Sequence, residues 1–340
     1  VRAAGIRGGG MSGKQSLTGP DGTSLVLSVD GWKYHLYAGH PVLPEELACR
    51  AFYGGLYEAT IAPLIPYAIR GVIWYQGENG PRADNYPKVF KDLIKDWRRN
   101  WGQGDFPFYF CQLANYHSKQ AAVDENGGWA GMREAQATAL ELANTGMACL
   151  IDVGKLGCQA RDIHPRNNFE QGRRLALIAR DKIYGEDIVS SGPMCDSMEI
   201  TGDKILVKFK SVGSGLLRAG ITGWYDHTIM PLPAHRSDSI QGFTIAGADG
   251  DFRMAHAHIV GRAGVKGRNT VAVSHPKVPE PKYVRFAWHS NPLHNLYNME
   301  QLPAVPFRTD QLDLLKKPQR TSRSKGHRAF LKASMHSRSR

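Results

Sequence analysis

The sequence predicts an α/β fold built on a parallel sheet, followed by a small all-β region. Buried strand patterns and amphipathic helix patterns alternate three times between residues 68 and 183, which is typical of βα units. From residue 187 onward only short strand patterns remain, separated by turn residues. With 340 residues and 42% hydrophobic residues, the chain is long and apolar enough to bury a full core.

The first βα unit covers residues 68–100. Residues 68–75 form a short run of apolar, β-branched and aromatic residues that stops at Gln76-Gly77, as a buried strand does. A helix is predicted over residues 85–100, where six apolar side chains recur at helical spacing (Tyr86, Val89, Phe90, Leu93, Ile94 and Trp97).

The next two units repeat this order. Strands are predicted over residues 106–113 and 147–153, and helices over residues 129–143 and 168–183. In the later β-rich region, residues 198–207 predict a hairpin that turns on Gly202-Asp203. Further strands are expected at 243–245, 258–260, 270–273 and 283–288, in a small sandwich or a sheet packed on the α/β body.

The charge is distributed unevenly along the chain. The sequence has 43 Lys and Arg against 31 Asp and Glu, a net charge of +12. Residues 314–340 hold nine of the basic residues and no acidic residue, so the rest has 34 basic against 31 acidic groups and a net charge of +3. We therefore divide the chain into an irregular lead-in (1–55), the α/β domain (56–186), the β-rich region (187–310) and a basic, disordered tail (311–340).

Several classes of protein are disfavoured by composition. The five cysteines are spread out and form no C-x-x-C pair, which disfavours a zinc site or a dense disulfide framework. Cys111 and Cys149 lie in apolar runs and are expected in the core. His256 and His258 share one strand face, but no third metal ligand is near them in the sequence, so we predict an exposed face and no metal. No segment approaches the roughly 18 apolar residues of a membrane helix.

Polar loops that directly follow buried strands are the candidate sites, because reactive groups in such sheets lie beyond the carboxyl ends of the strands. After the first strand, Gln76, Gly77, Glu78 and Asn79 supply amide donors that could stabilise an oxyanion, with a glycine that allows close backbone approach. Taken alone, these residues favour an ordinary polar turn over such a site.

A second candidate precedes the third helix. Asp162 stands two residues before His164 and could hold the imidazole in the tautomer that a general base needs. Pro165 suits a first helical position. The alternative is that Asp162 caps the helix and His164 is a surface residue.

Two tryptophans lie beside glycine-rich turns. Trp101 and Trp129 could line a sugar site or pack in the core.

Longer motifs resemble the sialate O-acetylesterase family, which belongs to the SGNH (GDSL-like) hydrolases. The resemblance is carried by Gly71-Val-Ile-Trp-Tyr-Gln-Gly-Glu, Arg133-Glu-Ala-Gln, Asp162-Ile-His-Pro-Arg-Asn, Gly172-Arg-Arg-Leu-Ala-Leu, Val284-Arg-Phe-Ala-Trp and Leu302-Pro-Ala-Val-Pro-Phe-Arg-Thr-Asp. It runs from about residue 56 to 310 in order, which is more specific than a short motif. It implies a flavodoxin-like parallel sheet of the SGNH type.

The resemblance also implies hydrolysis of acyl esters by a serine nucleophile and a histidine base. His164 matches the catalytic histidine and Asp162 the acidic residue of its block, although many SGNH enzymes place the aspartate at the position that Arg161 occupies here. Gln76 and Asn79 match the oxyanion donors, with Asn79 one place earlier than in the common Gly-Glu-Ser-Asn form. Glu78 is expected to orient its neighbours.

The family's N-terminal Gly-Gln-Ser-Asn-Met block, which holds the nucleophile, has no match in this sequence. Ser12 and Ser16 are the nearest serines, but neither follows a hydrophobic strand. We therefore identify no nucleophile and expect an N-terminally truncated esterase, with little activity as an isolated chain and any secretion signal upstream.

Two functions remain open on the sequence. The first is an esterase that removes O-acetyl groups from sialic acid or a related sugar, without a cofactor and in a secreted or periplasmic setting. The second is a non-catalytic carbohydrate-binding or scaffold protein of the same fold. The expected partner is an O-acetylated carbohydrate; neither a membrane nor a specific nucleic acid is expected, since the excess charge lies in the tail.

Overall fold

A computed structural model describes residues 54–79, 83–116, 128–154, 163–165, 167–222, 228–231, 239–261 and 266–310, together with two short strands near the N-terminus. Residues 1–65 and 66–340 form two separate compact units. The first unit contains the antiparallel strands β1 (Gln15–Thr18) and β2 (Ser24–Leu27), the helix α1 (Gly55–Thr60) and the 3-10 turn η3 (Ala62–Leu64). The sequence patterns predicted no strand in residues 1–55. Among the described residues, no helix has the length and apolar character that a membrane crossing requires.

The second unit is built on a parallel sheet, as the alternating strand and helix patterns predicted. Its strands β3 (Val72–Trp74), β4 (Phe108–Cys111) and β5 (Thr145–Ala148) lie in the order β3-β4-β5, and both neighbouring pairs are parallel. The central strand β4 is buried along its full length. The carboxyl ends of all three strands therefore meet at one edge of the sheet.

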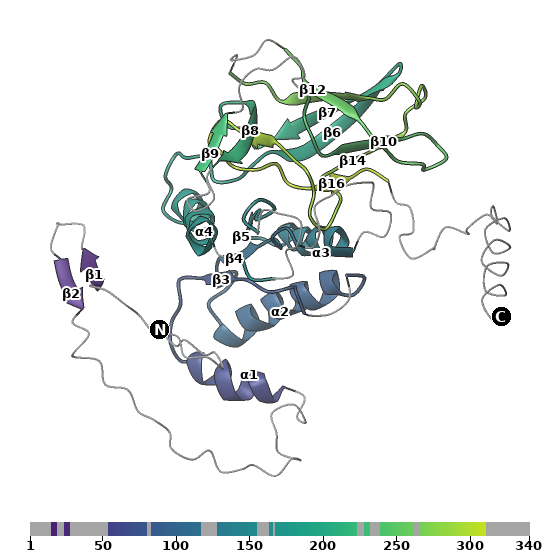
Figure 1. Ribbon diagram of the computed structural model, residues 1–340. Helices are drawn as coiled ribbons and strands as arrows, with labels where there is room; N and C mark the ends of the chain where they lie inside the picture. The colour runs from purple at the N-terminus through teal and green to yellow at the C-terminus, as the bar shows by residue number, and fades with distance from the viewer. Residues whose placement is uncertain are drawn as a thin grey trace, which may run out of the picture. The chain divides into compact units, whose positions relative to one another are not determined.

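Helices cover both faces of this sheet (Figure 1). The helices α2 (Tyr86–Trp101) and α3 (Gly128–Ala137) pack on the face formed by Phe108, Phe110 and Met147. The helix α4 (Asn168–Lys182) packs on the opposite face, where Leu175 and Ile178 contact the cluster formed by Tyr109, Cys111 and Ala148. The result is a three-layer α/β/α arrangement.

The sequence of α2 explains both which face of the helix is buried and where the helix ends. Tyr86, Phe90, Ile94 and Arg98 are its buried residues, one on each successive turn, so a single stripe faces the core. The helix ends at Gly102, whose φ of 64° is the left-handed conformation that glycine adopts without a steric penalty.

The remaining strands form three antiparallel sheets, and the predicted hairpin on Gly202-Asp203 is confirmed as the pair β6 and β7. The sheet orders are β12-β13-β7-β6, β11-β10-β14-β16 and β15-β8-β9. The strand bounds are β6 (Met194–Thr201), β7 (Lys204–Lys210), β8 (Leu216–Thr222), β9 (Thr228–Pro231), β10 (Phe243–Ala246), β11 (Arg253–Met254), β12 (His256–Ile259), β13 (Thr270–Ser274), β14 (Tyr283–Phe286), β15 (Leu296–Asn298) and β16 (Phe307–Arg308).

Some boundaries differ from the sequence-based expectation. The third strand was predicted over residues 147–153 but ends at Ala148, because the chain turns at residues 150–153, where the amide of Val153 donates to the carbonyl of Leu150. The predicted helix over 129–143 ends as an α-helix at Ala137 and continues as the 3-10 turn η4 (Thr138–Glu141). Apolar composition does not distinguish a strand from the buried turn that follows it.

Candidate active site

The loop after β3 carries four of the predicted site residues. The Gln76 side chain is fixed at both ends of its amide: Oε1 accepts from the Tyr86 hydroxyl at 3.0 Å, and Nε2 lies 3.4 Å from the carbonyl of Asn79. The Gln76 carbonyl accepts from Gln136 Nε2 at 2.9 Å. Asn79 is exposed, whereas Glu78 is half-buried. The four residues thus form a loop that is bound to α2 through Tyr86 and to α3 through Gln136.

Gly77 is required by the packing beneath this loop. It is buried and has a φ of 152°, a conformation that residues with a side chain rarely adopt. A Cβ atom at this position would lie 2.8 Å from Gln136 Nε2 and 3.3 Å from Leu113 Cδ2. The backbone here therefore packs directly on the amide group that binds Gln76.

A buried arginine organises the carboxyl end of β4. Arg133 on α3 donates to the carbonyls of Leu113 and Ala114 and to those of His289 and Ser290, at 2.8 to 2.9 Å. Burial lowers the pKa of Arg133 to about 10. Through this one guanidinium, the loop after β4 is joined to a segment of the β-rich part.

Two buried asparagines strengthen the same junction. Asn115 Nδ2 donates to Asn291 Oδ1 at 3.0 Å, and Asn115 Oδ1 accepts from the amide of Gly154 at 2.7 Å. Asn115 therefore connects the loops that follow β4 and β5 with the β-rich part. A Cβ atom on Gly154 would lie 2.2 Å from the carbonyl oxygen of Asn115, so this contact also depends on glycine.

Asp152 in the turn after β5 is the centre of a buried ionic group. Its two carboxylate oxygens accept from Arg174 of α4 at 2.6 and 2.9 Å, and the hydroxyl of Tyr297 lies 3.3 Å from Oδ2. Burial alone would raise the pKa of Asp152, but the Arg174 guanidinium holds it below its ordinary value. Arg174 also donates to the carbonyl of Cys149 at 2.6 Å and to Glu170 at 3.1 Å.

His294 lies beside this group, and its Nδ1 atom is shielded from solvent. Burial lowers the pKa of His294 to about 4, although the nearby Asp152 carboxylate acts in the opposite direction. The imidazole is therefore neutral at neutral pH, and the positive charges of Arg133 and Arg174 favour that state.

His164 lies on the short segment that precedes α4. Its side chain is exposed, and the next residue, Pro165, is buried. Pro165 was predicted at the first helical position, but α4 begins at Asn168 and its N-cap is Asn167, whose Oδ1 accepts from the amide of Glu170 at 3.1 Å. The capping role considered for Asp162 thus belongs to Asn167. Asp162 itself lies outside the described residues.

The predicted residues that the structure describes lie in segments that follow the two outer strands, whose carboxyl ends share one edge of the sheet. Gln76 to Asn79 follow β3, and His164 lies between the turn after β5 and the start of α4, with β4 between the two outer strands. This is the edge at which the loops of a parallel α/β sheet bind ligands.

Comparison with known proteins gives a consistent result. Residues 51–177 match the family described as carbohydrate esterase, sialic acid-specific acetylesterase. The sialate O-acetylesterase of Mus musculus is 34% identical over 161 residues, and that of Homo sapiens is 32% identical over 168 residues. Over these stretches the chain is similar to sialate O-acetylesterases. The matched stretches cover 43% and 45% of this chain but 29% and 32% of those proteins, so the chain spans about a third of the length of the curated relatives it matches.

A solved structure extends the similarity into the β-rich part. A carbohydrate acetylesterase from Xanthomonas citri is 37% identical, with a TM-score of 0.62, over 76% of this chain and 54% of that one. Gln76 to Asn79 and His164 all lie within the stretch that matches the sialate O-acetylesterase family.

Sequence reasoning did not assign roles to the buried polar residues beneath this edge of the sheet. Arg133, Gln136 and Arg174 lie within the motifs that carry the family resemblance, which was the available signal. Asp152 falls within the strand predicted over residues 147–153, and nothing in the local pattern showed that it pairs with an arginine 22 positions later.

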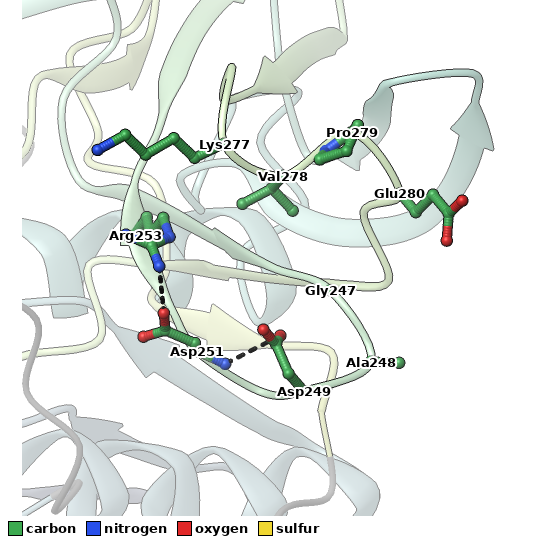
Figure 2. Close-up of a pocket in the computed structure, with 9 residues that line it drawn as sticks. All are labelled: Gly247, Ala248, Asp249, Asp251, Arg253, Lys277, Val278, Pro279 and Glu280. Carbon is green, nitrogen blue, oxygen red and sulfur yellow. Dashed lines mark hydrogen bonds and ion pairs between the residues drawn. The ribbon is translucent and has the colours of Figure 1, made fainter.

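A separate pocket lies in the β-rich part and does not belong to this edge. Figure 2 shows its lining of Gly247, Ala248, Asp249, Asp251, Arg253, Lys277, Val278, Pro279 and Glu280. Asp251 pairs with Arg253, and Asp249 accepts from the backbone amide of Asp251 at 3.2 Å. Its aspartates are thus engaged in local contacts. Among the described residues, no group of three or more His, Cys, Asp or Glu side chains could hold a metal ion.

Proposed function

We propose that this chain carries the base and oxyanion parts of an esterase site that removes O-acetyl groups from sialic acid or a related carbohydrate. The observation that supports the proposal is that Gln76 to Asn79 directly follow β3 and His164 lies just before α4, both within the stretch that matches the acetylesterase family. We further propose that the three-layer part is of the SGNH (flavodoxin-like) type.

The proposed reaction is acyl transfer followed by hydrolysis. His164 takes the proton of a serine hydroxyl, the serine oxygen attacks the acetyl carbonyl, and the carbonyl oxygen becomes an oxyanion. The amides of Gln76 and Asn79 stabilise that oxyanion. Collapse of the intermediate releases the sugar alcohol, to which His164 returns the proton, and water then hydrolyses the acetyl-serine to acetate.

The other residues have supporting roles in this proposal. Gly77 allows the loop to lie close to the reacting group, Glu78 orients its neighbours, and Asp162 holds the His164 imidazole in the reactive tautomer. We assign the nucleophile to no residue of this chain. Of the two serines nearest its N-terminus, Ser12 lies outside the described residues, and Ser16 lies in β1, opposite Val26 of β2.

A binding experiment tests the proposed site. We expect the purified chain to bind O-acetylated N-acetylneuraminic acid more tightly than its de-acetylated form in calorimetric titration, and His164→Ala to reduce that preference. His258→Ala, a substitution on the exposed surface of β12, is the matched control and should leave the preference unchanged. Equal affinity for both sugars would contradict an acetylesterase site.

A turnover experiment separates the esterase from the non-catalytic alternative. Because no nucleophile is identified, we expect the isolated chain to hydrolyse p-nitrophenyl acetate no faster than buffer. Hydrolysis well above buffer that His164→Ala abolishes would place a nucleophile within this chain. Sugar binding without acetyl preference and without any effect of His164 would favour the non-catalytic carbohydrate-binding protein.

A further inference from the structure

An aromatic pair lies at the carboxyl end of the central strand β4. Tyr116 follows that strand, and Trp129 lies at the second position of α3. Their ring centroids are 4.9 Å apart at an interplanar angle of 38°, and both side chains are half-buried, so part of each remains accessible to solvent.

The pair is held on rigid support. The indole Nε1 of Trp129 donates to the carbonyl of Ala114 at 2.8 Å, and the backbone amide of Tyr116 donates to the carbonyl of Ser290 at 3.1 Å. Both acceptors are also bound by the buried guanidinium of Arg133, which fixes the backbone on either side of the pair.

A polar group suited to sugar hydroxyls lies near the rings. A Cβ atom on Gly128, the residue before Trp129, would lie 3.6 Å from the hydroxyl oxygen of Ser290, whose backbone carbonyl accepts from the amide of Tyr116. A binding site for a small polar molecule combines apolar or aromatic surface with a few fixed polar groups, and this combination matches a pyranose, which has C–H faces and hydroxyl edges.

Trp101, another partly exposed tryptophan beside a glycine-rich turn, has a different setting. It lies at the end of α2, where its ring packs on Trp97 and Phe106 and its Nε1 donates to the carbonyl of Tyr67. Phe106 precedes β4, so Trp101 is at the amino edge of the sheet, away from the candidate active site.

We infer that Tyr116 and Trp129 form a sugar-binding platform that holds the pyranose ring of the acetylated carbohydrate against the carboxyl end of β4. The inference rests on the proposed function, because β4 separates the strand that leads to Gln76 from the strand that leads to His164. In this arrangement the platform binds the sugar ring, and the two outer loops act on its acetyl group.

The platform is tested by comparing two ligands on one set of variants. The probes are the methyl glycosides of O-acetylated N-acetylneuraminic acid and of N-acetylneuraminic acid, titrated into wild type, Tyr116→Ala, Trp129→Phe, Trp129→Ala and the control Trp101→Ala. We expect Tyr116→Ala and Trp129→Ala each to weaken both glycosides by between about twofold and tenfold, because stacking on the ring is lost whether or not the acetyl group is present. Trp129→Phe should retain most of the affinity, since it keeps an aromatic face.

The two ligands make the possible outcomes distinguishable. Thermal unfolding of each variant identifies any that fail to fold, and Tyr116→Ala, at a half-buried side chain, remains informative if Trp129→Ala does not fold. Unchanged affinity in both Tyr116→Ala and Trp129→Ala, or in Tyr116→Ala alone if Trp129→Ala does not fold, would overturn the platform and leave the proposed function intact. A second outcome is that Tyr116→Ala and Trp129→Ala lose affinity for both glycosides, while the wild type binds the two glycosides equally. This outcome would support the platform and contradict the proposed function. A wild type that binds neither glycoside would overturn both.

Discussion

Arg133 is the buried side chain on which the carboxyl end of β4 depends most directly. Its guanidinium compensates four backbone carbonyls that have little access to water. We expect Arg133→Met to lower the free energy of unfolding by about 3 to 5 kcal/mol, because buried acceptors without a donor keep their full desolvation cost.

Urea unfolding measures this loss, and Arg99→Met provides the control. Arg99 on α2 forms an exposed ion pair with Asp96, so its removal should change stability by less than about 0.5 kcal/mol. Similar effects of the two substitutions would contradict the role assigned to Arg133.

His294 makes the stability of the fold depend on pH. Its ordinary pKa of 6.5 applies to the unfolded chain, and burial lowers its pKa to about 4 in the folded chain, where Asp152, Arg133 and Arg174 are its charged neighbours. Between these two values the unfolded state binds more protons, so stability falls as pH falls through this window. The Asp152 carboxyl, whose pKa is lowered, loses its contribution only at still lower pH.

We expect wild type to be about 1 to 2 kcal/mol less stable at pH 5 than at pH 7 through His294. His294→Gln should reduce this difference, and His258→Gln on the exposed surface of β12 should not. The check is the urea midpoint of the three proteins at both pH values. An identical pH difference in wild type and His294→Gln would show that other groups cause it.

Helix α4 is anchored at its start, next to the segment that carries His164. The Asn167 cap satisfies the amide of Glu170, while Glu170 itself accepts from Arg173 and Arg174. We expect Asn167→Ala to destabilise the protein by about 1 kcal/mol, the usual effect of losing such a cap. Asn168→Ala, one residue further and without the capping bond, should be close to neutral in the same thermal unfolding assay; equal losses would contradict the assignment.

Glycines in two different elements should respond in opposite directions to the same substitution. Gly77→Ala forces a Cβ against Gln136 in a backbone conformation unfavourable to alanine, and should cost about 1 to 3 kcal/mol. Gly172→Ala lies in the exposed interior of α4, where the new Cβ has no atom beyond its neighbours and the backbone of its own helix within 4 Å, so it should stabilise by about 0.5 to 1 kcal/mol. Chemical denaturation of both variants decides the point, and stabilisation by Gly77→Ala would rule out the clash.

Sequence patterns predicted those elements whose evidence is local. The apolar stripe from Tyr86 to Trp97 predicted α2 to within a residue, and Gly202-Asp203 predicted the β6–β7 hairpin. The buried polar contacts could not be read in this way, because Asn115 and Asn291 are 176 positions apart and each alone is an ordinary loop residue. The candidate loop of Gln76 was recognised by its place after a strand, whereas its dependence on Gln136 required the fold.

The parallel sheet and the β-rich part share one continuous interior. A single cluster of buried residues includes Phe108 and Phe110 of the sheet together with Phe243 and Phe286 of the β-rich part. Polar contacts cross the same boundary: Arg133 binds two carbonyls of the β-rich part, and Tyr297 lies against Asp152. Separate domains within one chain usually meet through smaller and more polar surfaces.

We therefore expect the described part of residues 66–310 to unfold as one cooperative unit. Hydrogen exchange should give the same opening free energy for the slowest amides of β4 and of β7, and Tyr297→Phe, which removes the hydroxyl beside Asp152, should lower both by the same amount, about 1 kcal/mol. Met198→Ala, on the exposed surface of β6, is the control and should leave both values nearly unchanged. Two results would contradict this: a clearly lower opening free energy for the β7 amides than for the β4 amides, or a change of only one of the two values in Tyr297→Phe. Either result would make the β-rich part a separate folding unit. The contacts of Arg133 and Asn291 would then not hold the loops at the carboxyl end of β4 against the β-rich part.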